Sequence, residues 1–300
     1  MKKLKKNQST YLLLYTAILL FTSAVNAAEG GGSSYMPGFY GDFGMAVAPE
    51  PGNYLSNFMG YNTVGNDANG SNLLFELPGI IRVTDTKIAG GNYWVGFFPY
   101  VLHTDSVSTQ ANGTKTRADR GGAGDMYALP IALSWQWREL SILAFEGVVL
   151  PTGSYEKTRS LNSGRNYWTS DTNLGLTWLP KGTNFDLSMV LGYMVNTENS
   201  ATQYRTGDEL HLDFMGGYYI TPQLGVGIAG SYYRQITPDT GNGVPAGIPL
   251  AEYSSIGPAL MYTVKLGEKD VTFSAKWLHE YDVNNHIPGD YAILRTILKF

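Results

Sequence analysis

The chain ends in the segment Tyr291-Ala-Ile-Leu-Arg-Thr-Ile-Leu-Lys-Phe300, in which two faces of different character alternate. One face, read backward from the last residue in steps of two, has no charge: Phe300, Leu298, Thr296, Leu294 and Ala292. The other face carries the charges of Lys299 and Arg295. A strand of about ten residues crosses a bilayer when it is tilted, with one face to lipid and the other to a barrel interior. The ending therefore predicts a transmembrane β-strand.

Phe300 carries a second signal, because it places an aromatic ring at the last position of the chain. This ending resembles the C-terminal signature of bacterial outer-membrane β-barrels, in which the terminal aromatic is read by the barrel assembly machinery. The resemblance implies an assembly signal at Phe300 and a location in the outer membrane of a Gram-negative cell. The implied partners are that machinery, outer-membrane lipids and lipopolysaccharide.

The N-terminus has the three parts of a secretory signal peptide. Met1–Lys6 is cationic, and Tyr11–Phe21 is an apolar run too short to span a bilayer as a helix. Val25 and Ala27 supply modest or small side chains at the two positions that precede a cleavage site. We therefore expect residues 1–27 to be removed after export, with an uncleaved interfacial anchor as the alternative.

Composition excludes several classes of protein. The 300 residues include no Cys, which argues against a small scaffold held together by disulfides. The net charge is −4 and no basic block follows the signal peptide, so nucleic-acid binding has no electrostatic support. The 36 Gly and 21 Tyr suit tight turns and interfacial aromatic girdles. Composition alone fits a soluble β-sandwich equally well.

From Asn53 onward, the sequence contains about twelve strand candidates and no convincing amphipathic helix. Alternation with period two is clearest in three segments: 125–137, 185–195 and 209–220. Similar candidates lie near 72–84, 172–178, 224–232, 256–266 and 271–280. The segments 93–103 and 140–150 alternate poorly, so we expect a β-bulge there.

The connections between these candidates distinguish a barrel from a sandwich. Read backward from the C-terminus, long connections alternate with short ones, as the loops and turns of outer-membrane barrels do. The longer ones are 282–290, 237–252, 197–207, 151–166, 103–124 and the medium 65–72. The short ones are 267–270, 221–223, 180–184, 138–139 and 87–92. We predict an all-β fold: a transmembrane antiparallel up-and-down barrel of about 12 strands, with both termini in the periplasm.

Residues 28–52 precede the first strand and are too rich in Gly and Pro to face lipid as a strand. Two strings stand out in and after this stretch, Gly38-Phe-Tyr-Gly-Asp-Phe-Gly44 and Pro49-Glu-Pro-Gly-Asn-Tyr54. With Leu150-Pro-Thr-Gly-Ser-Tyr155, they resemble the outer-membrane transporter family associated with the meta-cleavage pathway of phenol degradation. The resemblance covers essentially the whole chain after the signal peptide.

The resemblance implies passage of small hydrophobic or aromatic solutes across the outer membrane, by analogy with fatty-acid-type outer-membrane channels. In those channels an N-terminal segment plugs the lumen. We hypothesise the same for residues 28–52, with a disordered periplasmic tail as the alternative. The plug residues would be Tyr35, Phe39, Tyr40, Asp42 and Phe43.

The predicted inward face of the barrel mixes charged, polar and apolar side chains. The candidates for contact with a transported solute are Glu76, Arg82, Met126, Asp186, Met194, His211, Asp213, Lys276, Glu280 and Arg295. Such a mixture favours amphipathic or aromatic solutes, whereas a general porin needs a watery, charged channel. Filling of a narrow barrel by opposed charges is the alternative interpretation for each residue.

Four prolines fall inside predicted strands: Pro78, Pro99, Pro130 and Pro258. Each removes one hydrogen bond from a ladder that has no free edge, so bulges or local openings are expected. A lateral gap toward lipid is the functional interpretation, and irregular packing is the alternative.

None of the candidate enzyme motifs lies in the structural context that its chemistry requires. Gly225-Val-Gly-Ile-Ala-Gly230 matches a dinucleotide-binding pattern, but the residues after it continue as a strand. Outer-membrane lipases place His and Ser two residues apart, whereas here His103 is followed by Ser106 and His211 by Asp213. We therefore predict no catalytic residue, no cofactor and no metal site. A general porin, a structural or binding barrel and, less so, a lipid-modifying enzyme remain the alternatives to a channel.

Overall fold

The computed structural model describes residues 28–110 and 112–300, so the predicted signal peptide lies outside the described residues. One short 3-10 helix, η1 (Glu29–Gly31), precedes the strands. The strands are β1 (Gly52–Gly65), β2 (Gly70–Ile88), β3 (Gly91–Phe98), β4 (Val101–Thr109), β5 (Lys115–Ala123), β6 (Met126–Trp137), β7 (Leu140–Leu150), β8 (Thr169–Trp178), β9 (Phe185–Asn196), β10 (Glu209–Thr221), β11 (Leu224–Gln235), β12 (Glu252–Leu266), β13 (Lys269–Asn284) and β14 (Gly289–Lys299). None of the described helices is long and apolar enough to cross a membrane.

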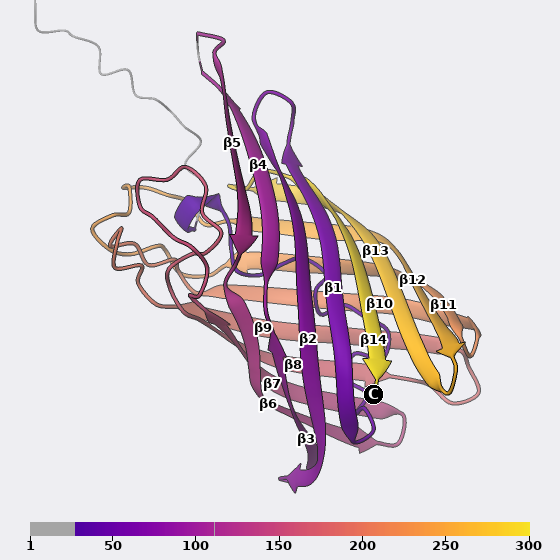
Figure 1. Ribbon diagram of the computed structural model, residues 1–300. Helices are drawn as coiled ribbons and strands as arrows, with labels where there is room; N and C mark the ends of the chain where they lie inside the picture. The colour runs from indigo at the N-terminus through magenta and orange to yellow at the C-terminus, as the bar shows by residue number, and fades with distance from the viewer. Residues whose placement is uncertain (1–27, 111) are drawn as a thin grey trace, which may run out of the picture.

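The strands form one closed antiparallel barrel, because β1 pairs with β2 on one edge and with β14 on the other. The wall has twelve strands, since β3 with β4 and β5 with β6 are each one wall strand interrupted in the middle. Figure 1 shows the closed wall, with β4 and β5 rising beyond its rim. The predicted fold class is confirmed.

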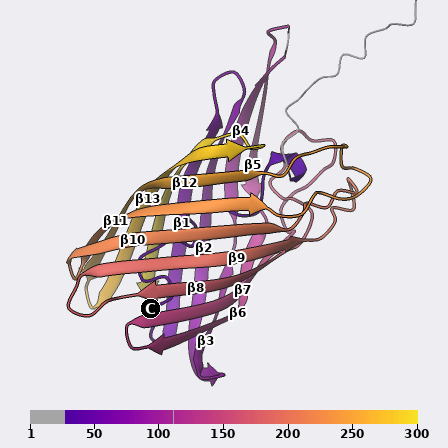
Figure 2. The same ribbon diagram turned by 180° about the vertical axis from the view of Figure 1, so that it is seen from behind.

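The connections are sorted by length between the two ends of the barrel. Phe300 lies at the end with the short turns, where its backbone N–H donates to Asn53 O at 2.9 Å. These turns comprise residues 89–90, 138–139, 179–184, 222–223 and 267–268. The opposite end carries the connections 66–69, 110–114, 151–168, 197–208, 236–251 and 285–288, several of which gather at one side of Figure 2. We call these the short-turn end and the long-loop end.

One expected connection is wrong, because residues 103–124 contain most of the β4–β5 hairpin instead of a long loop. The hairpin is polar on both faces, so it carries no alternation of apolar residues for sequence reasoning to detect. The edge of β5 away from β4 has no strand partner among the described residues.

The two ends of the described chain, Ala28 and Phe300, lie at opposite ends of the barrel, and the side of the membrane on which each terminus lies stays a prediction. Residues 28–51, which we call the plug, run through the interior from the long-loop end to the short-turn end (Figure 1). At the start of the plug, Ala28 N donates to Asp239 Oδ2 in the connection 236–251. At its end, Glu50 pairs with Lys299 of β14 at 2.9 Å.

The outward face of the wall is mainly apolar, whereas the inward face carries both polar and apolar side chains. In β9, buried residues alternate with exposed ones along the whole strand. The exposed residues of β9 are Phe185, Leu187, Met189, Leu191 and Tyr193. This is the surface expected of a strand with one face in lipid.

Strand pairing lapses in a diagonal band that we call the seam, defined by Pro78, Pro99–Tyr100 and Gly124–Asp125. On its edge away from β1, β2 pairs with β4 up to Glu76 and with β3 from Ile80, leaving Pro78 without a partner there. Pro99 and Tyr100 separate β3 from β4, and Gly124 and Asp125 separate β5 from β6. The seam therefore crosses three neighbouring wall strands.

The two remaining prolines within strands also lie where strand pairing is irregular. Pro130 lies in a register shift of β6 between Ala128 and Ile131. The bulge expected within 93–103 is not in β3, because the register shift between Trp94 and Gly96 comes from the same extra residue of β6, between Leu129 and Ala132. The bulge expected within 140–150 lies instead in β6, the strand opposite. Pro258 stands where the pairing of β12 with β13 is interrupted.

A charge on the outward face should report directly on the membrane contact. Leu191 is 43% exposed in the middle of β9, and Ile220 is 54% exposed near the short-turn end of β10. We expect Leu191→Arg to lower the free energy of unfolding by about 2–4 kcal/mol and Ile220→Arg by about 0–1 kcal/mol, because the cost of a cation falls toward the interface. Denaturant unfolding in liposomes measures both, and equal losses would contradict this placement of the bilayer.

Candidate functional site

The plug begins at the long-loop end, where polar side chains hold its first residues. Ala28 N donates to Asp239 Oδ2 at 3.1 Å, while Asp239 Oδ1 accepts from Gly207 N at 2.8 Å. Asn199 Nδ2 donates to both carboxylate oxygens of Glu29, at 2.9 and 3.1 Å. The start of the plug is therefore anchored to two different connections at this end.

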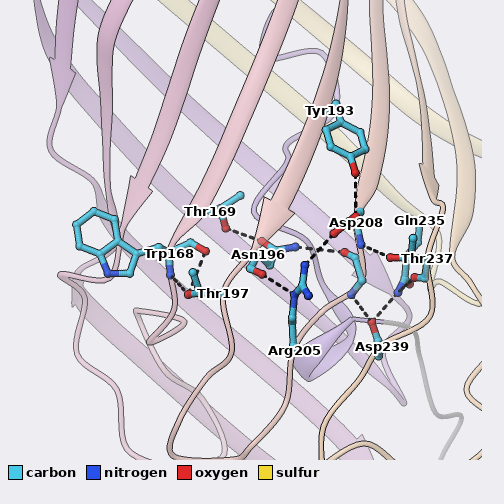
Figure 3. Close-up of polar contacts among 11 residues, drawn as sticks. Trp168, Thr169, Tyr193, Asn196, Thr197, Arg205, Asp208, Gln235, Thr237 and Asp239 are labelled. Atoms are coloured by element: carbon cyan, nitrogen blue, oxygen red, sulfur yellow. Dashed lines mark hydrogen bonds and ion pairs between the residues drawn. The ribbon is translucent and has the colours of Figure 1, made fainter.

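These connections are also tied to each other, as Figure 3 shows. The Asp208 carboxylate accepts from Tyr193 OH at 2.8 Å and from Arg205 Nη2 at 3.3 Å. Asp208 N donates to Thr237 Oγ1 at 2.7 Å, and Arg205 Nε donates to Asn196 O at 2.9 Å. The two connections that hold the plug are thus hydrogen-bonded to each other and to the adjoining strands, and they are not independent loops.

Midway through the lumen, the plug meets a buried polar centre built on His211 of β10. His211 Nε2 lies 3.0 Å from Asp171 Oδ1, and its Nδ1 lies 3.7 Å from Asp213 Oδ2. The two carboxylates accept hydrogen bonds from plug tyrosines: Tyr35 OH to Asp213 at 3.0 Å and Tyr40 OH to Asp171 at 2.7 Å. Both tyrosine rings stack on the imidazole, with centroids 4.3 and 5.5 Å away. We call these five residues the His211 centre.

Closer to the short-turn end, a buried lysine binds the plug backbone. Lys276 Nζ donates to Gly38 O at 2.6 Å and to Gly41 O at 2.7 Å. Next to it, Asp42 pairs with Arg295 at 3.2 Å. The plug is therefore bound here by two wall cations, Arg295 through the Asp42 carboxylate and Lys276 through the backbone.

Two glycines allow the plug to turn against the wall. Gly38 has φ +77°, and a Cβ there would lie 2.3 Å from Leu278 Cδ1, so both conformation and space require glycine. Gly44 has φ +60°, and its N–H donates to Asp186 Oδ2 at 2.8 Å. The same carboxylate oxygen accepts from Tyr219 OH at 3.1 Å. These turns bring the plug backbone within reach of wall side chains.

The opposite side of the lumen, near the seam, is apolar and aromatic. Phe39 of the plug stacks on Phe58 of β1 at 4.3 Å, and Phe58 contacts Phe98 of β3 at 6.3 Å. Further buried apolar side chains of this side are Phe75, Leu77, Ile81, Val83 and Leu129. The lumen therefore has a polar half on β8, β10, β13 and β14 and an apolar half on β1–β3 and β6.

Most residues predicted to face the lumen do lie on its buried surface. They are Asp186, Met194, His211, Asp213, Lys276, Glu280 and Arg295, and the predicted plug residues Tyr35, Phe39, Tyr40, Asp42 and Phe43 lie within the barrel against them. Glu280 Oε2 accepts from Gly289 N at 2.8 Å. Contact of any of these residues with a solute remains a prediction, as does the role of Phe300 in assembly.

Glu76 and Arg82 do not face the lumen, so their predicted placement is wrong. They alternate with buried Phe75 and Leu77 and lie on the exposed face of β2, where each hydrogen-bonds an asparagine of β1. The reason is that both faces of β2 carry large apolar side chains, such as Ile80 on one and Ile81 on the other, so alternation does not decide which face points inward. The two charges then suggested the wrong one.

The predicted inward placement of Met126 is also wrong, because the register of β6 shifts at Pro130. Tyr127 and Leu129 are buried before the shift, whereas Ala132 and Ser134 are buried after it. A single parity for the whole strand therefore assigned Met126 to the wrong face.

Three residues of the site were missed from sequence. Asp171 and Tyr233 lie on strands that were recognised, but each was separated from its plug partner by more than a hundred residues. Tyr127 follows Met126, so an inward-facing Met126 places Tyr127 on the opposite face, yet the Tyr127 hydroxyl lies 3.1 Å from that of Tyr40. The only sequence signal for Asp171 is its position next to the predicted strand near 172–178.

Replacement of Lys276 should loosen the plug. Lys276→Met removes both hydrogen bonds to the plug backbone, and a hydrogen bond to a charged group contributes about 1.5–3 kcal/mol. We expect single-channel ion conductance in planar bilayers to rise above that of the wild type. Lys181→Met, in the exposed turn 179–184, is the matched control and should leave conductance unchanged. Unchanged conductance of a folded Lys276→Met barrel would show that this lysine does not restrain the plug.

Comparison with solved structures supports the same architecture. An outer membrane channel from Pseudomonas putida F1 superposes with a TM-score of 0.73 at 16% identity, covering 89% of this chain and 100% of that one. The CymD monoaromatic hydrocarbon channel gives a TM-score of 0.42 at 10% identity, covering 84% and 89% of the two chains. A Pseudomonas aeruginosa FadL homologue gives 0.41 at 10% identity, covering 92% and 96%. At these identities, only the first similarity is informative, and it concerns the fold.

Sequence comparison assigns the family. No curated protein matches the chain. A family model described as "Putative MetA-pathway of phenol degradation" matches residues 49–296, which include β1–β13 and most of β14. The protein with this plugged twelve-stranded barrel therefore belongs to that family.

Proposed function

We propose that the protein is an outer-membrane channel for the passive uptake of small hydrophobic or aromatic compounds. The observation that carries the proposal is the two-sided lumen, in which an apolar aromatic half adjoins the seam while charges are confined to the other half. An apolar solute gains from contacts such as those that Phe39 makes with Phe58. The family description and the fold similarity to an outer membrane channel support the proposal.

The seam offers such a solute a lateral route. At Pro99 and Pro78 the backbone of the wall lacks part of its hydrogen-bond ladder, and the nearby lumen is lined by Phe75 and Phe98. Separating strands is easiest where few ladder bonds must break. An apolar molecule released from the lumen toward lipid would therefore leave beside the apolar half.

The alternatives fit less well. In a general porin the interior holds water, whereas here the charges of Asp42, Asp186 and Lys276 are paired with the plug or the wall. For an enzyme, the interactions of His211 lead to aspartates and plug tyrosines and not to a nucleophile. No group of three or more His, Asp or Glu in the described part of the chain is arranged to hold a metal ion.

The proposal includes the route to the membrane. Residues 1–27 would direct export and be cleaved, and Phe300 would be read by the barrel assembly machinery. Phe300 is 51% exposed at the short-turn end, so the ring is available for such recognition. Outer-membrane lipids and lipopolysaccharide would then contact the exposed apolar wall.

Solute flux into liposomes containing the refolded protein tests the function. We expect toluene and phenol to enter faster than sugars of similar size, and removal of residues 29–50 to increase aromatic flux, because the plug occupies the lumen. A heat-modifiable shift on gels serves as the control for folding. Equal flux of aromatics and sugars would instead make the protein a general pore, and no flux of either from a folded barrel would favour a structural or binding role.

A further inference from the structure

Tyr35 of the plug occupies a slot whose walls all belong to the barrel. Its ring lies between His211 of β10 and Tyr233 of β11, with centroids 4.3 and 5.9 Å away and interplanar angles of 18° and 9°. Its hydroxyl donates to Asp213 Oδ2 at 3.0 Å. Only 7% of Tyr35 is exposed, so the slot encloses the ring.

The slot is held in place by wall residues, together with plug residues other than Tyr35: Ser33 donates to Glu209 and Gly38 N donates to Asp213. His211 is fixed by Asp171 at 3.0 Å and lies against Gly192 of β9, where a Cβ would be 2.1 Å from Nε2. Tyr233 donates its hydroxyl to Glu209 at 2.9 Å and stacks on Tyr253 at 4.6 Å. Because none of these supports involves the Tyr35 ring, they stay in place when that ring alone leaves the slot.

The slot also has hydrogen-bonding capacity that Tyr35 leaves unused. His211 is fully buried, yet its Nδ1 makes no hydrogen bond within the described residues and lies 3.7 Å from Asp213 Oδ2. This is the oxygen that receives the Tyr35 hydroxyl. A ligand with a hydroxyl at this point therefore meets a carboxylate acceptor and an imidazole nitrogen together.

A tyrosine side chain is chemically a para-alkyl phenol. We propose that the slot of His211, Asp213 and Tyr233 is a binding site for small phenols, and that Tyr35 is its internal occupant in the plugged state. A phenolic solute that enters the slot takes over the contact with Asp213 and displaces an anchor of the plug. This inference rests on the proposed transport function and specifies one solute class and the way in which it opens the lumen.

The hydroxyl decides which solutes use the slot. A phenol donates to the buried Asp213 carboxylate, whereas toluene leaves that charge without the donor that Tyr35 supplied. We therefore expect the slot to bind a phenol at least about tenfold more tightly than toluene, because one hydrogen bond to a charged group corresponds to that factor or more in affinity. In the wild type, a phenol binds only when Tyr35 has left the slot. The apparent affinity for the phenol is therefore the affinity of the empty slot multiplied by the fraction of molecules in which the slot is empty.

Tyr35→Ala opens the slot for a direct test with two probes, p-cresol and toluene. By isothermal titration calorimetry of the detergent-solubilised full chain, we expect p-cresol to bind Tyr35→Ala at least about tenfold more tightly than toluene. Adding Asp213→Ala to this variant should abolish the preference. Equal affinity for the two probes, or no binding of p-cresol by the folded variant, would overturn the proposal.

Phe39→Ala is the matched control, because it also removes a plug ring that stacks on a wall ring. Phe39 stacks on Phe58 and has no hydroxyl, so its vacated position should bind toluene at least as tightly as p-cresol. A p-cresol preference of the same size in Phe39→Ala would count against a specific slot.

A milder variant tests the competition without emptying the slot. Tyr35→Phe keeps the ring but loses the hydrogen bond to Asp213, so p-cresol should displace it at several-fold lower concentration than the wild type requires. Ion conductance measured against p-cresol concentration reports the displacement, and identical curves for both proteins would contradict it. Aromatic flux without a p-cresol preference would reject the slot alone, whereas p-cresol binding without aromatic flux would reject the transport function.

Discussion

The structure depends on one constraint: every backbone N–H and C=O group inside a bilayer must find its partner within the protein. The closure of β1 onto both β2 and β14 satisfies this requirement around the wall, and the alternation of exposed apolar and buried residues follows from it. The seam is where the constraint is relaxed, at Pro78 and Pro99. It lies beside the apolar half of the lumen, where a gap in the ladder would expose few charges.

The polar half of the lumen presents the opposite problem. Charges enclosed in a narrow barrel need partners, and the plug supplies many of them through Asp42, Tyr35 and the backbone carbonyls at Gly38 and Gly41. The plug is thus a complementary polar surface as well as a filler. Anything that displaces it has to offer comparable hydrogen bonds, because otherwise buried charges are left unpaired.

Sequence reasoning reached the architecture because the strand period and the alternating connection lengths are local properties of the chain. It failed where the local pattern is ambiguous: β2 has apolar side chains on both faces, β6 changes parity at Pro130, and the polar β4–β5 hairpin has no apolar alternation. The plug residues follow from the resemblance to fatty-acid-type channels, while their Gly and Pro content excludes a strand that faces lipid. Their partners could not be predicted, since pairing Tyr40 with Asp171 requires the three-dimensional register of eleven other wall strands.

The attachment of the plug to β1 at Gly52 has a further consequence. A plug that has left the lumen remains tethered at the short-turn end, so its return is an intramolecular reaction. Short flexible tethers present a ligand at an effective concentration on the order of millimolar. A solute therefore competes with the tethered plug at all times. The plug returns to the lumen when the solute concentration falls below the effective concentration of the plug, and no separate closing signal is needed.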